Sequence, residues 1–457
     1  MLTDQQKAHL VELNKTCRSF TVVLKWKHGM LTNLECLKKP KDVALIGLFC
    51  EQIKETLSEE VKAHFDMILY YKADYSNFAA VFTDFSNVNI PELDEFADEL
   101  VTLVDKSKID VIETEEFTVD TICRLRDRLG LRGYRTADIE HLRNKSLLKK
   151  LAAEKGIPTA KFKIVDFAKE FCPKAIVDLI EVSIGGYPLH RKPIQGCGSG
   201  GAGRLDSSEE LEVWAKEVIA SGDKSTYLVE EQLSGLEFWA CTVLLQNGSV
   251  KPHFIIYLEN GYTVPDYFKT GRPIPFFAGR FEELEDVFPK LTDWVLDAVK
   301  KLNAPHPHPF CVQGFQKTPN SSDYILTECG YRMNGVRGCG LSYEASGVSQ
   351  EVALFQSHFD PDYTADPDPN RPKTHMCYMW FPQKKGFLRN LTALPGSPDV
   401  ESSIEANWLL PVGSETKDCE SFGDFLLSFA VRNMDRQRLH KDVAWIADNW
   451  RPEISPN

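Results

Sequence analysis

The segment HRKPIQGCGSGGAGRL, residues 190–205, joins a basic pair to a loop that is rich in glycine. Arg191 and Lys192 stand on a predicted strand, and five glycines follow between positions 196 and 203. Because glycine has no Cβ, such a loop can bring backbone N–H groups close to phosphate oxygens, and Lys192 supplies a positive charge. A flexible linker is the alternative. The basic pair and the flanking apolar strands favour a phosphate-binding cover, although no Gly-Lys-Ser/Thr ending makes it a Walker loop.

The segment VEEQLSGLEF, residues 229–238, is a second candidate for contact with a nucleotide. It is predicted to be a strand that turns at Gly235. The backbone of residues 230–233 presents alternating C=O and N–H groups that suit an adenine edge, and Glu237 could accept hydrogen bonds from both ribose hydroxyls. Taken alone, this segment is better explained as an acidic hairpin edge with ordinary surface glutamates.

The segment FCVQGFQKTPNSSDYILTECGYRMNG, residues 310–335, contains candidates for a metal site. Two predicted strands run antiparallel through the PNSSD turn and place Gln313 and Glu328 on neighbouring strands. Oxygen donors of this kind suit Mg²⁺, which binds through one or two protein groups and completes its shell with phosphates and water. Arg332 and Arg337 could bind a phosphate or a substrate carboxylate. A hairpin with a buried Glu–Arg pair explains the segment equally well.

The first 135 residues are predicted to form a parallel α/β lobe. DVALIGLF (42–49) and KIDVIETE (108–115) have the pattern of buried strands. Residues 51–65 have helical spacing, and a helix over 119–130 is expected to stop at Gly130. Alternating strands and helices indicate a parallel sheet with crossover helices.

A second region follows, from residue 136 to about 375. It opens with a predicted helix over 138–155, with Lys145 at its centre, where a lone lysine is most often solvated. Several strand-like segments come next, and an Asn-Gly turn at Asn247 joins two of them into a hairpin. The Pro- and Asp-rich stretch 360–373 is predicted to be a linker.

The third region covers residues 376–457. The segments HMCYMWFP (375–382) and NWLLPVG (407–413) are predicted to be strands. The segments DFLLSFAVRNM (424–434) and VAWIADNW (443–450) are predicted to be helices.

The composition excludes several classes of protein. The chain has 457 residues and a net charge of −13, which argues against a nucleic-acid surface because such a surface needs clustered Lys and Arg. No secretory signal is visible, and no apolar stretch approaches the roughly 20 residues of a membrane helix. The twelve cysteines include no CxxC pair, so reduced thiols and a cytoplasmic location are expected.

The order of these elements resembles the ATP-grasp superfamily over about 200 residues: a helical lysine, a lysine with a glycine loop, an E-x6-E strand and an acidic hairpin that ends in R-x-x-G. Within it, the chain looks most like the carboxylate–amine ligases of the amino-acid ligase and carnosine synthase group. The tail, residues 384–416, is similar to the C-terminal subdomain of that group. The resemblance implies an α/β fold with a parallel N-terminal lobe (1–135), an ATP-grasp domain (136–375) whose lid covers about 160–230, and a small C-terminal subdomain (376–457).

The resemblance also implies roles for individual residues. ATP and Mg²⁺ (or Mn²⁺) are the expected cofactors, and Lys192 and Arg332 are the expected catalytic residues. The remaining roles are these: phosphate contacts for Lys145 and Lys192, the phosphate cover for Ser199, Gly200 and Gly201, adenine for Glu230, Glu231 and Leu233, ribose for Glu237, and metal for Gln313 and Glu328. Small-molecule carboxylate and amine substrates would be the partners, without nucleic acid or membrane, and a homodimer is compatible with the resemblance.

Two positions depart from the pattern of the superfamily. Gln313 stands where Asp or Glu is usual, and Gly330 stands where an Asn usually follows the second acid. The implied reaction is amide formation through an acyl phosphate, with release of ADP and phosphate. The alternatives are a biotin-carboxylase-like enzyme and a nucleotide-binding protein whose weakened metal site does not support turnover.

Overall fold

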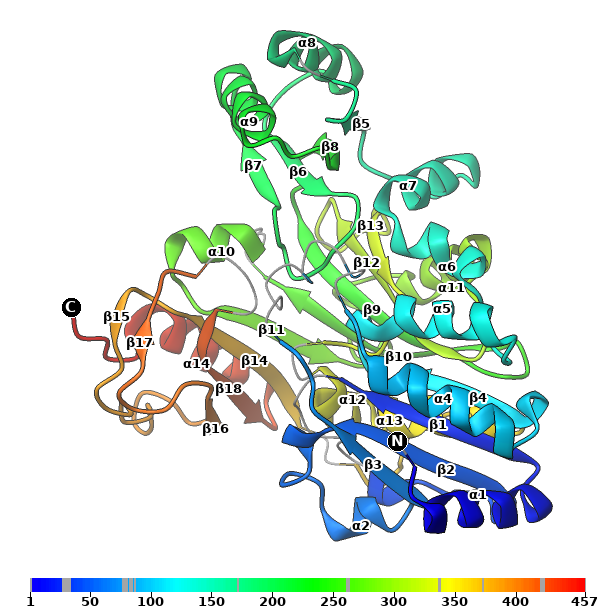
Figure 1. The fold of residues 1–457 in the computed structure, drawn as a ribbon. Coiled ribbons are helices and arrows are strands. Elements are labelled where there is room, and N and C mark those ends of the chain that lie inside the picture. Colours follow the sequence, from blue (N-terminus) through cyan, green and yellow to red (C-terminus); the bar gives the residue numbers. More distant parts are fainter. Residues whose placement is uncertain are drawn as a thin grey trace.

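The computed structural model shows an α/β protein with one large sheet and three smaller sheets among the described residues (Figure 1). The structure describes residues 2–26, 34–75, 81, 85, 88–170, 172–259, 264–335, 338–371, 374–419 and 424–456. Among these residues, the strands form two four-stranded sheets, one eight-stranded sheet and one two-stranded sheet. The predicted α/β class is confirmed.

The N-terminal sheet is parallel, as the sequence predicted, with strand order β3-β2-β1-β4. Its strands are β1 (Ser19–Lys25), β2 (Val43–Cys50), β3 (Met67–Tyr71) and β4 (Ile109–Glu113). Around it lie α1 (Asp4–Thr16), α2 (Glu59–Lys62), α4 (Pro91–Leu103), α5 (Val119–Leu129) and the 3-10 turns η1 (Leu34–Cys36), η2 (Glu51–Ile53), η4 (Lys106–Lys108) and η5 (Glu116–Thr118). Gly130 ends α5 in the left-handed conformation, with a φ of 69°, as predicted.

The segment after β2 departs from the prediction. A single helix was predicted over residues 51–65, but the chain forms η2 and then the short helix α2. Ser58 caps α2 by accepting a hydrogen bond from the Val61 N–H. A capping serine lies outside the helix it caps, so it interrupts the predicted run.

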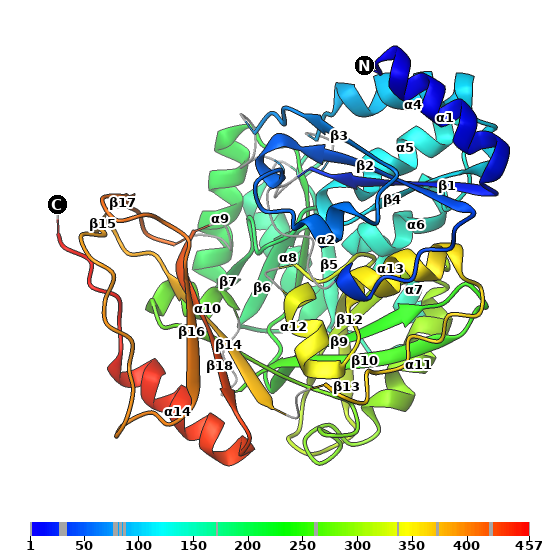
Figure 2. The same cartoon turned by 90° about the horizontal axis from the view of Figure 1, so that it is seen from below.

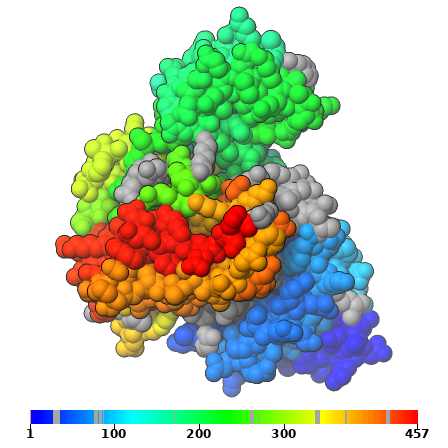
Figure 3. All heavy atoms as spheres, turned by 90° about the vertical axis from the view of Figure 1, so that its left-hand side faces the viewer, coloured from blue at the N-terminus to red at the C-terminus, as the bar shows by residue number. Residues whose placement is uncertain are grey.

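Residues 162–231 form a separate small lobe, which we call the lid (Figure 3, top). Its sheet has the order β5-β8-β6-β7, and its neighbouring strands are antiparallel. The elements are β5 (Phe162–Asp166), α8 (Pro173–Ile184), β6 (Leu189–Pro193), β7 (Gly203–Leu205), α9 (Ser208–Ser221) and β8 (Thr226–Glu231). Side chains of α8 and α9, among them Ile176 and Leu211, pack with Val165 and Val229 into a core that belongs to this lobe alone.

The eight-stranded sheet runs through the middle of the molecule in the order β13-β12-β9-β10-β11-β14-β18-β16. Its strands are β9 (Leu236–Leu244), β10 (Val250–Leu258), β11 (Ile274–Gly279), β12 (His308–Gln316), β13 (Tyr324–Gly330), β14 (His375–Pro382), β16 (Ser403–Trp408) and β18 (Phe425–Asn433). The remaining elements are β15 (Gly386–Phe387), β17 (Glu415–Thr416), α10 (Val264–Thr270), α11 (Leu291–Leu302), α12 (Gly338–Ser346), α13 (Gln350–Phe359) and α14 (Arg436–Asn449). The predicted hairpin at Asn247 is confirmed, since β9 and β10 pair antiparallel across it.

Helix α13 connects the large sheet with the N-terminal lobe (Figure 2). Its residues Val352, Leu354 and Phe355 belong to the apolar core of the N-terminal sheet. The carbonyl oxygen of Phe359 also accepts a hydrogen bond from Arg18 at 2.8 Å. The N-terminal lobe is therefore packed against the body of the molecule through a segment more than 200 residues away in the chain.

Two predictions for the C-terminal region are wrong in detail. The segment 424–434, predicted as a helix, forms β18, which lies between β14 and β16 and is buried along most of its length. An apolar run without alternation suits a strand buried on both faces as well as a helix, and the two flanking strands decide the outcome. The strand predicted over 407–413 begins earlier, at Ser403, and ends at Trp408.

The helix predicted over 138–155 is two helices, α6 (Thr136–Arg143) and α7 (Lys145–Glu154). Asn144 separates them, and its side-chain oxygen caps α7 by accepting from the N–H groups of Ser146 and Leu147. Asparagine is among the preferred capping residues. Lys145 therefore stands at the first position of a helix and not at the centre of one.

The remaining sequence predictions concern membranes and thiols. Among the described residues, no helix combines the length and the apolar composition that crossing a membrane requires. The cysteines whose side chains the structure describes are free thiols, as predicted.

Candidate functional site

Lys192 lies where the lid meets the large sheet. Its ammonium nitrogen forms an ion pair with Glu230 on β8 at 2.8 Å and another with Glu328 on β13 at 2.9 Å. Because Lys192 stands on the lid strand β6, the second ion pair crosses from the lid to the eight-stranded sheet. The structure thus brings together the lysine predicted to bind phosphate and the glutamate predicted to bind metal.

These ion pairs set the charge of the three groups. Burial would lower the pKa of Lys192, but Glu230 and Glu328 outweigh it and raise that pKa. Burial would raise the pKa of each carboxyl group, but Lys149 and Lys192 hold the pKa of Glu230 well below its usual range. Lys192 and Lys145 likewise lower the pKa of Glu328 to about 2. At neutral pH, a cation therefore lies between two carboxylates.

Lys149 belongs to the same cluster, although the sequence analysis did not single it out. Its ammonium nitrogen is 2.9 Å from the other oxygen of Glu230 and donates to the carbonyl oxygen of Leu326 at 3.1 Å. Its side chain is 0% exposed. The sequence did contain a signal, because Lys149 follows Lys145 by four residues and such a spacing puts both side chains on one face of a helix.

Lys145 contacts the start of the glycine loop. Its backbone N–H donates to the carbonyl oxygen of Ile194, and its ammonium group donates to that of Gly196, both at 2.9 Å. The loop needs left-handed backbone at several positions, including Gly196 with a φ of 93° and Gly201 with a φ of 68°. Lys145 and the loop that follows Lys192 are therefore in direct contact.

Ser199, Gly200 and Gly201 form the turn of this loop. Ser199 has a φ of 62°, which is uncommon for a residue with a side chain. The N–H of Gly200 donates to the carbonyl oxygen of Cys197 at 3.2 Å. Cys197 in turn packs against the apolar cluster that combines the core of the N-terminal lobe with Met333 and residues of α13. The predicted phosphate cover thus contacts parts of the molecule outside the lid.

The segment predicted to hold adenine covers the end of strand β8 and the residues that follow it. The Glu230 carboxylate is occupied by two lysines, and that of Glu231 accepts from the backbone N–H of Lys161 at 3.1 Å. Leu233 is buried in a small apolar cluster with Phe315. These side chains have structural partners, and the N–H groups of Glu231 and Gln232 donate to the carbonyl oxygens of Lys161 and Pro188, so contact with adenine would fall to the remaining backbone groups of the segment.

Glu237, the residue predicted to bind ribose, lies beside one of the predicted metal ligands. Its carboxylate accepts a hydrogen bond from the Gln313 side-chain amide at 2.8 Å. Burial and the charge of Glu328 raise the pKa of Glu237 to about 7, and the bond from Gln313 only partly opposes them. Glu237 is thus the one carboxyl of this cluster that titrates near neutral pH.

Gln313 and Glu328 are register partners on β12 and β13, as the sequence predicted. Because the amide nitrogen of Gln313 donates to Glu237, its amide oxygen is the atom that could accept a cation. Over the described part of the chain, no group of three or more His, Cys, Asp and Glu side chains could hold a metal ion. The donor set therefore fits Mg²⁺ only where phosphates and water supply most of its shell.

Arg332 is held by a carboxylate from the N-terminal lobe, which the sequence analysis missed. Its Nε donates to Glu116 at 2.9 Å. The other oxygen of Glu116 accepts from Arg143 at 3.1 Å, and Arg143 also pairs with Asp120. Nothing in the local sequence links positions 116 and 332. Arg337, the second arginine of the segment, lies outside the described residues.

Gly330 is not required by the backbone. Its φ is not in the left-handed region, and a Cβ built on it would lie 3.4 Å from the nearest side-chain atom, Cζ of Arg332. That separation is ordinary van der Waals contact. The position therefore has room for a Cβ, so glycine itself is not forced here by the backbone or by the nearest contacts.

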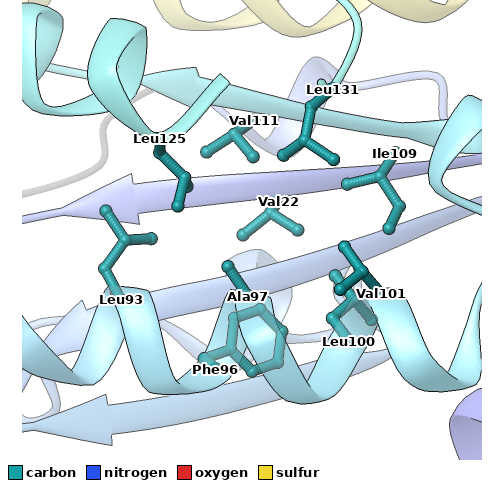
Figure 4. Close-up of a pocket in the computed structure, with 10 residues that line it drawn as sticks. All are labelled: Val22, Leu93, Phe96, Ala97, Leu100, Val101, Ile109, Val111, Leu125 and Leu131. Atoms are coloured by element: carbon teal, nitrogen blue, oxygen red, sulfur yellow. The ribbon is translucent and has the colours of Figure 1, made fainter. Parts of the chain in front are cut away.

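An interior pocket in the N-terminal lobe is a poor candidate for the site (Figure 4). Apolar side chains of β1, α4 and α5, such as Val22, Phe96 and Leu125, line it. Such a lining offers no group that would orient a polar substrate. The charged cluster around Lys192 is the better candidate.

Comparison with known proteins places this geometry in a known fold. No protein-family model matches the chain, and no curated protein matches its sequence. Solved structures do match. An L-amino acid ligase from Bacillus licheniformis aligns with a TM-score of 0.66 and 16% identity, over 97% of this chain and 100% of that one.

Two further structures contain nucleotides. A carboxyaminoimidazole ribonucleotide synthase from Aspergillus clavatus, complexed with ATP, has a TM-score of 0.59 and 12% identity over 95% of this chain and 100% of that one. The biotin carboxylase domain of a Hydrogenobacter thermophilus 2-oxoglutarate carboxylase, with MgADP and bicarbonate, has a TM-score of 0.54 and 14% identity over 90% of this chain and 86% of that one. The chain has the ATP-grasp fold, so the fold that the sequence resemblance implied is confirmed.

Proposed function

We propose that this protein is an ATP-dependent carboxylate–amine ligase that forms an amide or peptide-like bond. The observation that carries the proposal is the contact of Lys192 with Glu328 across the boundary of the lid and the large sheet. A cation that can bind phosphate and a carboxylate that can bind Mg²⁺ need to lie this close when both act on one triphosphate. The fold is shared with an L-amino acid ligase, which supports this reaction class.

The proposed site divides the work among the lobes. Lys145, Lys192 and the glycine loop with Ser199, Gly200 and Gly201 hold the phosphates. The backbone of the segment with Glu230, Glu231 and Leu233 holds adenine, Glu237 binds ribose, and Gln313 and Glu328 hold the metal. Mg²⁺, when bound, neutralises charge on the phosphate oxygens. Residues 162–231 would act as the lid that excludes water from the reacting groups.

The chemistry would proceed in two steps. A substrate carboxylate oxygen bonds to the γ-phosphorus of ATP, the bond from that phosphorus to the bridging oxygen breaks, and ADP leaves. The nitrogen of an amine then bonds to the carbonyl carbon of the acyl phosphate, inorganic phosphate leaves, and the nitrogen loses a proton. Lys192 and Arg332 stabilise the charge that moves with the phosphoryl group.

The test is ADP formation with a panel of carboxylic acids and amines, including amino acids, followed by mass spectrometry of the products. The proposal expects ADP and an amide in equal amounts, and it expects both to depend on the acid, the amine and Mg²⁺. The variant Lys192→Met serves as the inactive control. ADP formation without any amide product, over the whole panel, would contradict the ligase proposal.

Two alternatives have specific observations in their favour. The similarity to a biotin carboxylase domain with MgADP and bicarbonate supports a carboxylase. Such an enzyme would form ADP when bicarbonate and biotin are supplied as substrates. Gln313 and Gly330 support a protein that binds nucleotide without turnover, because they leave the predicted metal site with a single carboxylate, Glu328. Binding of MgADP measured by calorimetry, with no ADP formed under any condition, would favour the second.

A further inference from the structure

Lys149 is a buried lysine for which the proposed reaction has no direct use. It stands on α7, its side chain is 0% exposed, and its ammonium group lies 2.9 Å from Glu230 and 3.1 Å from the carbonyl oxygen of Leu326. Burial of an ammonium group is costly unless the group is paired and hydrogen-bonded. A lysine in such a place needs a physical reason.

The reason for a buried lysine here is that the two carboxylate oxygens of Glu230 have different lysine partners. One carboxylate oxygen of Glu230 pairs with Lys149 and the other with Lys192, at 2.9 and 2.8 Å. Without Lys149, the whole negative charge of this buried carboxylate would fall to Lys192. A stronger bond to Glu230 would hold the lysine back from a phosphate, since the same ammonium group cannot serve both partners equally.

The position of Lys149 adds a geometric effect. Its carbonyl partner Leu326 is on β13, two residues before Glu328, and the Leu326 N–H donates to the carbonyl oxygen of Pro158 at 2.8 Å. Glu230 is on the lid strand β8. Lys149 therefore connects helix α7, the lid and the strand that carries Glu328.

We propose that Lys149 is a positioning residue: by sharing the charge of Glu230, it leaves Lys192 free to bind the phosphates of the nucleotide. The inference rests on the proposed nucleotide site. The Lys149 side chain is 0% exposed, and its polar contacts are Glu230 and the carbonyl oxygen of Leu326. It acts through Glu230.

A purely structural ion pair would behave differently from a positioning residue. If Lys149 only stabilises the fold, its replacement lowers the melting temperature and leaves the affinity of the folded protein for nucleotide unchanged. If it acts through Glu230, its replacement weakens nucleotide binding only while Glu230 is charged. A comparison of proteins with a charged and with a neutral side chain at position 230 therefore distinguishes the two roles.

The experiment is a double-mutant cycle of Lys149→Met and Glu230→Gln, in the full chain, with the dissociation constant for MgADP measured by calorimetry. We expect Lys149→Met to weaken MgADP binding by about 10-fold, which is the order of one charge-assisted hydrogen bond. We expect Glu230→Gln and the double variant to bind MgADP equally, within about 2-fold. Lys150→Met, which removes an exposed lysine of the same helix, is the matched control and should bind as the wild type does.

Each outcome decides the matter. Wild-type affinity in a folded Lys149→Met variant, or a further loss of affinity when Lys149→Met is added to Glu230→Gln, would overturn the proposal. Should Lys149→Met fail to fold, a further loss of affinity in the double variant relative to Glu230→Gln would still overturn the proposal, because neither variant contains the Glu230 carboxylate. A wild-type protein that binds no MgADP would instead refute the proposed nucleotide site.

Discussion

The lid and the hairpin of β12 and β13 both bring charged groups to the site, but they differ in how completely these charges are paired. On the lid, the Glu230 carboxylate meets two lysines, and all three side chains are buried. On the hairpin, Glu328 is partly exposed, and its register partner is an amide, Gln313. The charges around Glu230 therefore form a network whose members pair with one another. The hairpin, in contrast, leaves part of a metal's coordination shell to be filled by ligands that are not part of the protein.

This difference has a functional meaning under the proposed reaction. A closed network holds Lys192 in one place before the nucleotide arrives, which lowers the cost of binding phosphate. A metal side with a single carboxylate binds Mg²⁺ weakly until ATP supplies further oxygens. Nucleotide and metal are then expected to bind together, and the following changes test that expectation.

The largest effect is expected for Lys192→Met. This change removes the cation that we propose binds phosphate and leaves Glu230 and Glu328 facing the phosphates without Lys192 between them. We expect affinity for MgATP to fall by about 1,000-fold, comparable to breaking a buried ion pair. Calorimetric titration measures it, and Lys155→Met, at an exposed position on the end of α7, is the control. Near wild-type affinity for MgATP in the Lys192 variant would show that this lysine is not part of the nucleotide site.

The second effect is expected for Glu328→Gln. Loss of the only carboxylate of the metal side should lower Mg²⁺-dependent ADP formation by about 100-fold, because a neutral amide does not balance the charge of the cation. Binding of ADP without metal should weaken much less, since Lys192 and the lid network remain. Rates measured over a series of Mg²⁺ concentrations give both quantities. Equal losses with and without metal would mean that Glu328 is not a metal ligand.

The third effect concerns stability and pH. The pKa of Glu237 is raised to about 7 by burial and by Glu328, so the folded state favours its protonated form. This group therefore stabilises the fold below its unfolded pKa, and that contribution is lost as pH rises through about 7. Glu237→Gln should be more stable than the wild type above pH 8 by about 2 kcal/mol, with little difference at pH 4.5. Denaturant unfolding at both pH values measures it, and a gap that does not change with pH would contradict the assignment.

The smallest effect is expected for Gly330→Asn. The backbone accepts a side chain here, with the nearest contact at 3.4 Å, and the new amide oxygen would stand next to Glu328. We expect Mg²⁺ to bind about 5-fold more tightly in the presence of ATP, in line with one additional neutral oxygen donor. Gly330→Ala, which adds bulk but no donor, is the control. An equal change in Mg²⁺ affinity in both variants would show that the asparagine oxygen does not coordinate Mg²⁺.

Local chemistry in the sequence predicted the parts of the fold that depend on neighbouring residues. The helix cap at Gly130, the hairpin turn at Asn247 and the facing of Gln313 and Glu328 all follow from short-range rules. The failures also have local causes. Asn144 was treated as a helical residue although its side chain suits a cap, and the capping role of Ser58 was overlooked.

Other features of the fold and the site could not be predicted from the sequence, because they depend on contacts between residues that are far apart in it. The strand β18 lies in its sheet only because β14 and β16 flank it, and the same residues alone are equally compatible with a helix. The pairing of Arg332 with Glu116 joins positions 216 residues apart. No pattern within a segment encodes such a contact.

What the sequence determined by itself was the set and order of the site's parts: the basic strand with its glycine loop, the E-x6-E strand and the hairpin with one acid and one amide. These are properties of residue type and spacing. The tertiary structure decided which charges meet: Lys192 with Glu230 and Glu328, Lys149 with Glu230, and Arg332 with Glu116. The physical reason is that ion pairs act over a few ångströms in space, whereas spacing along the chain fixes distances only within one helix or one hairpin.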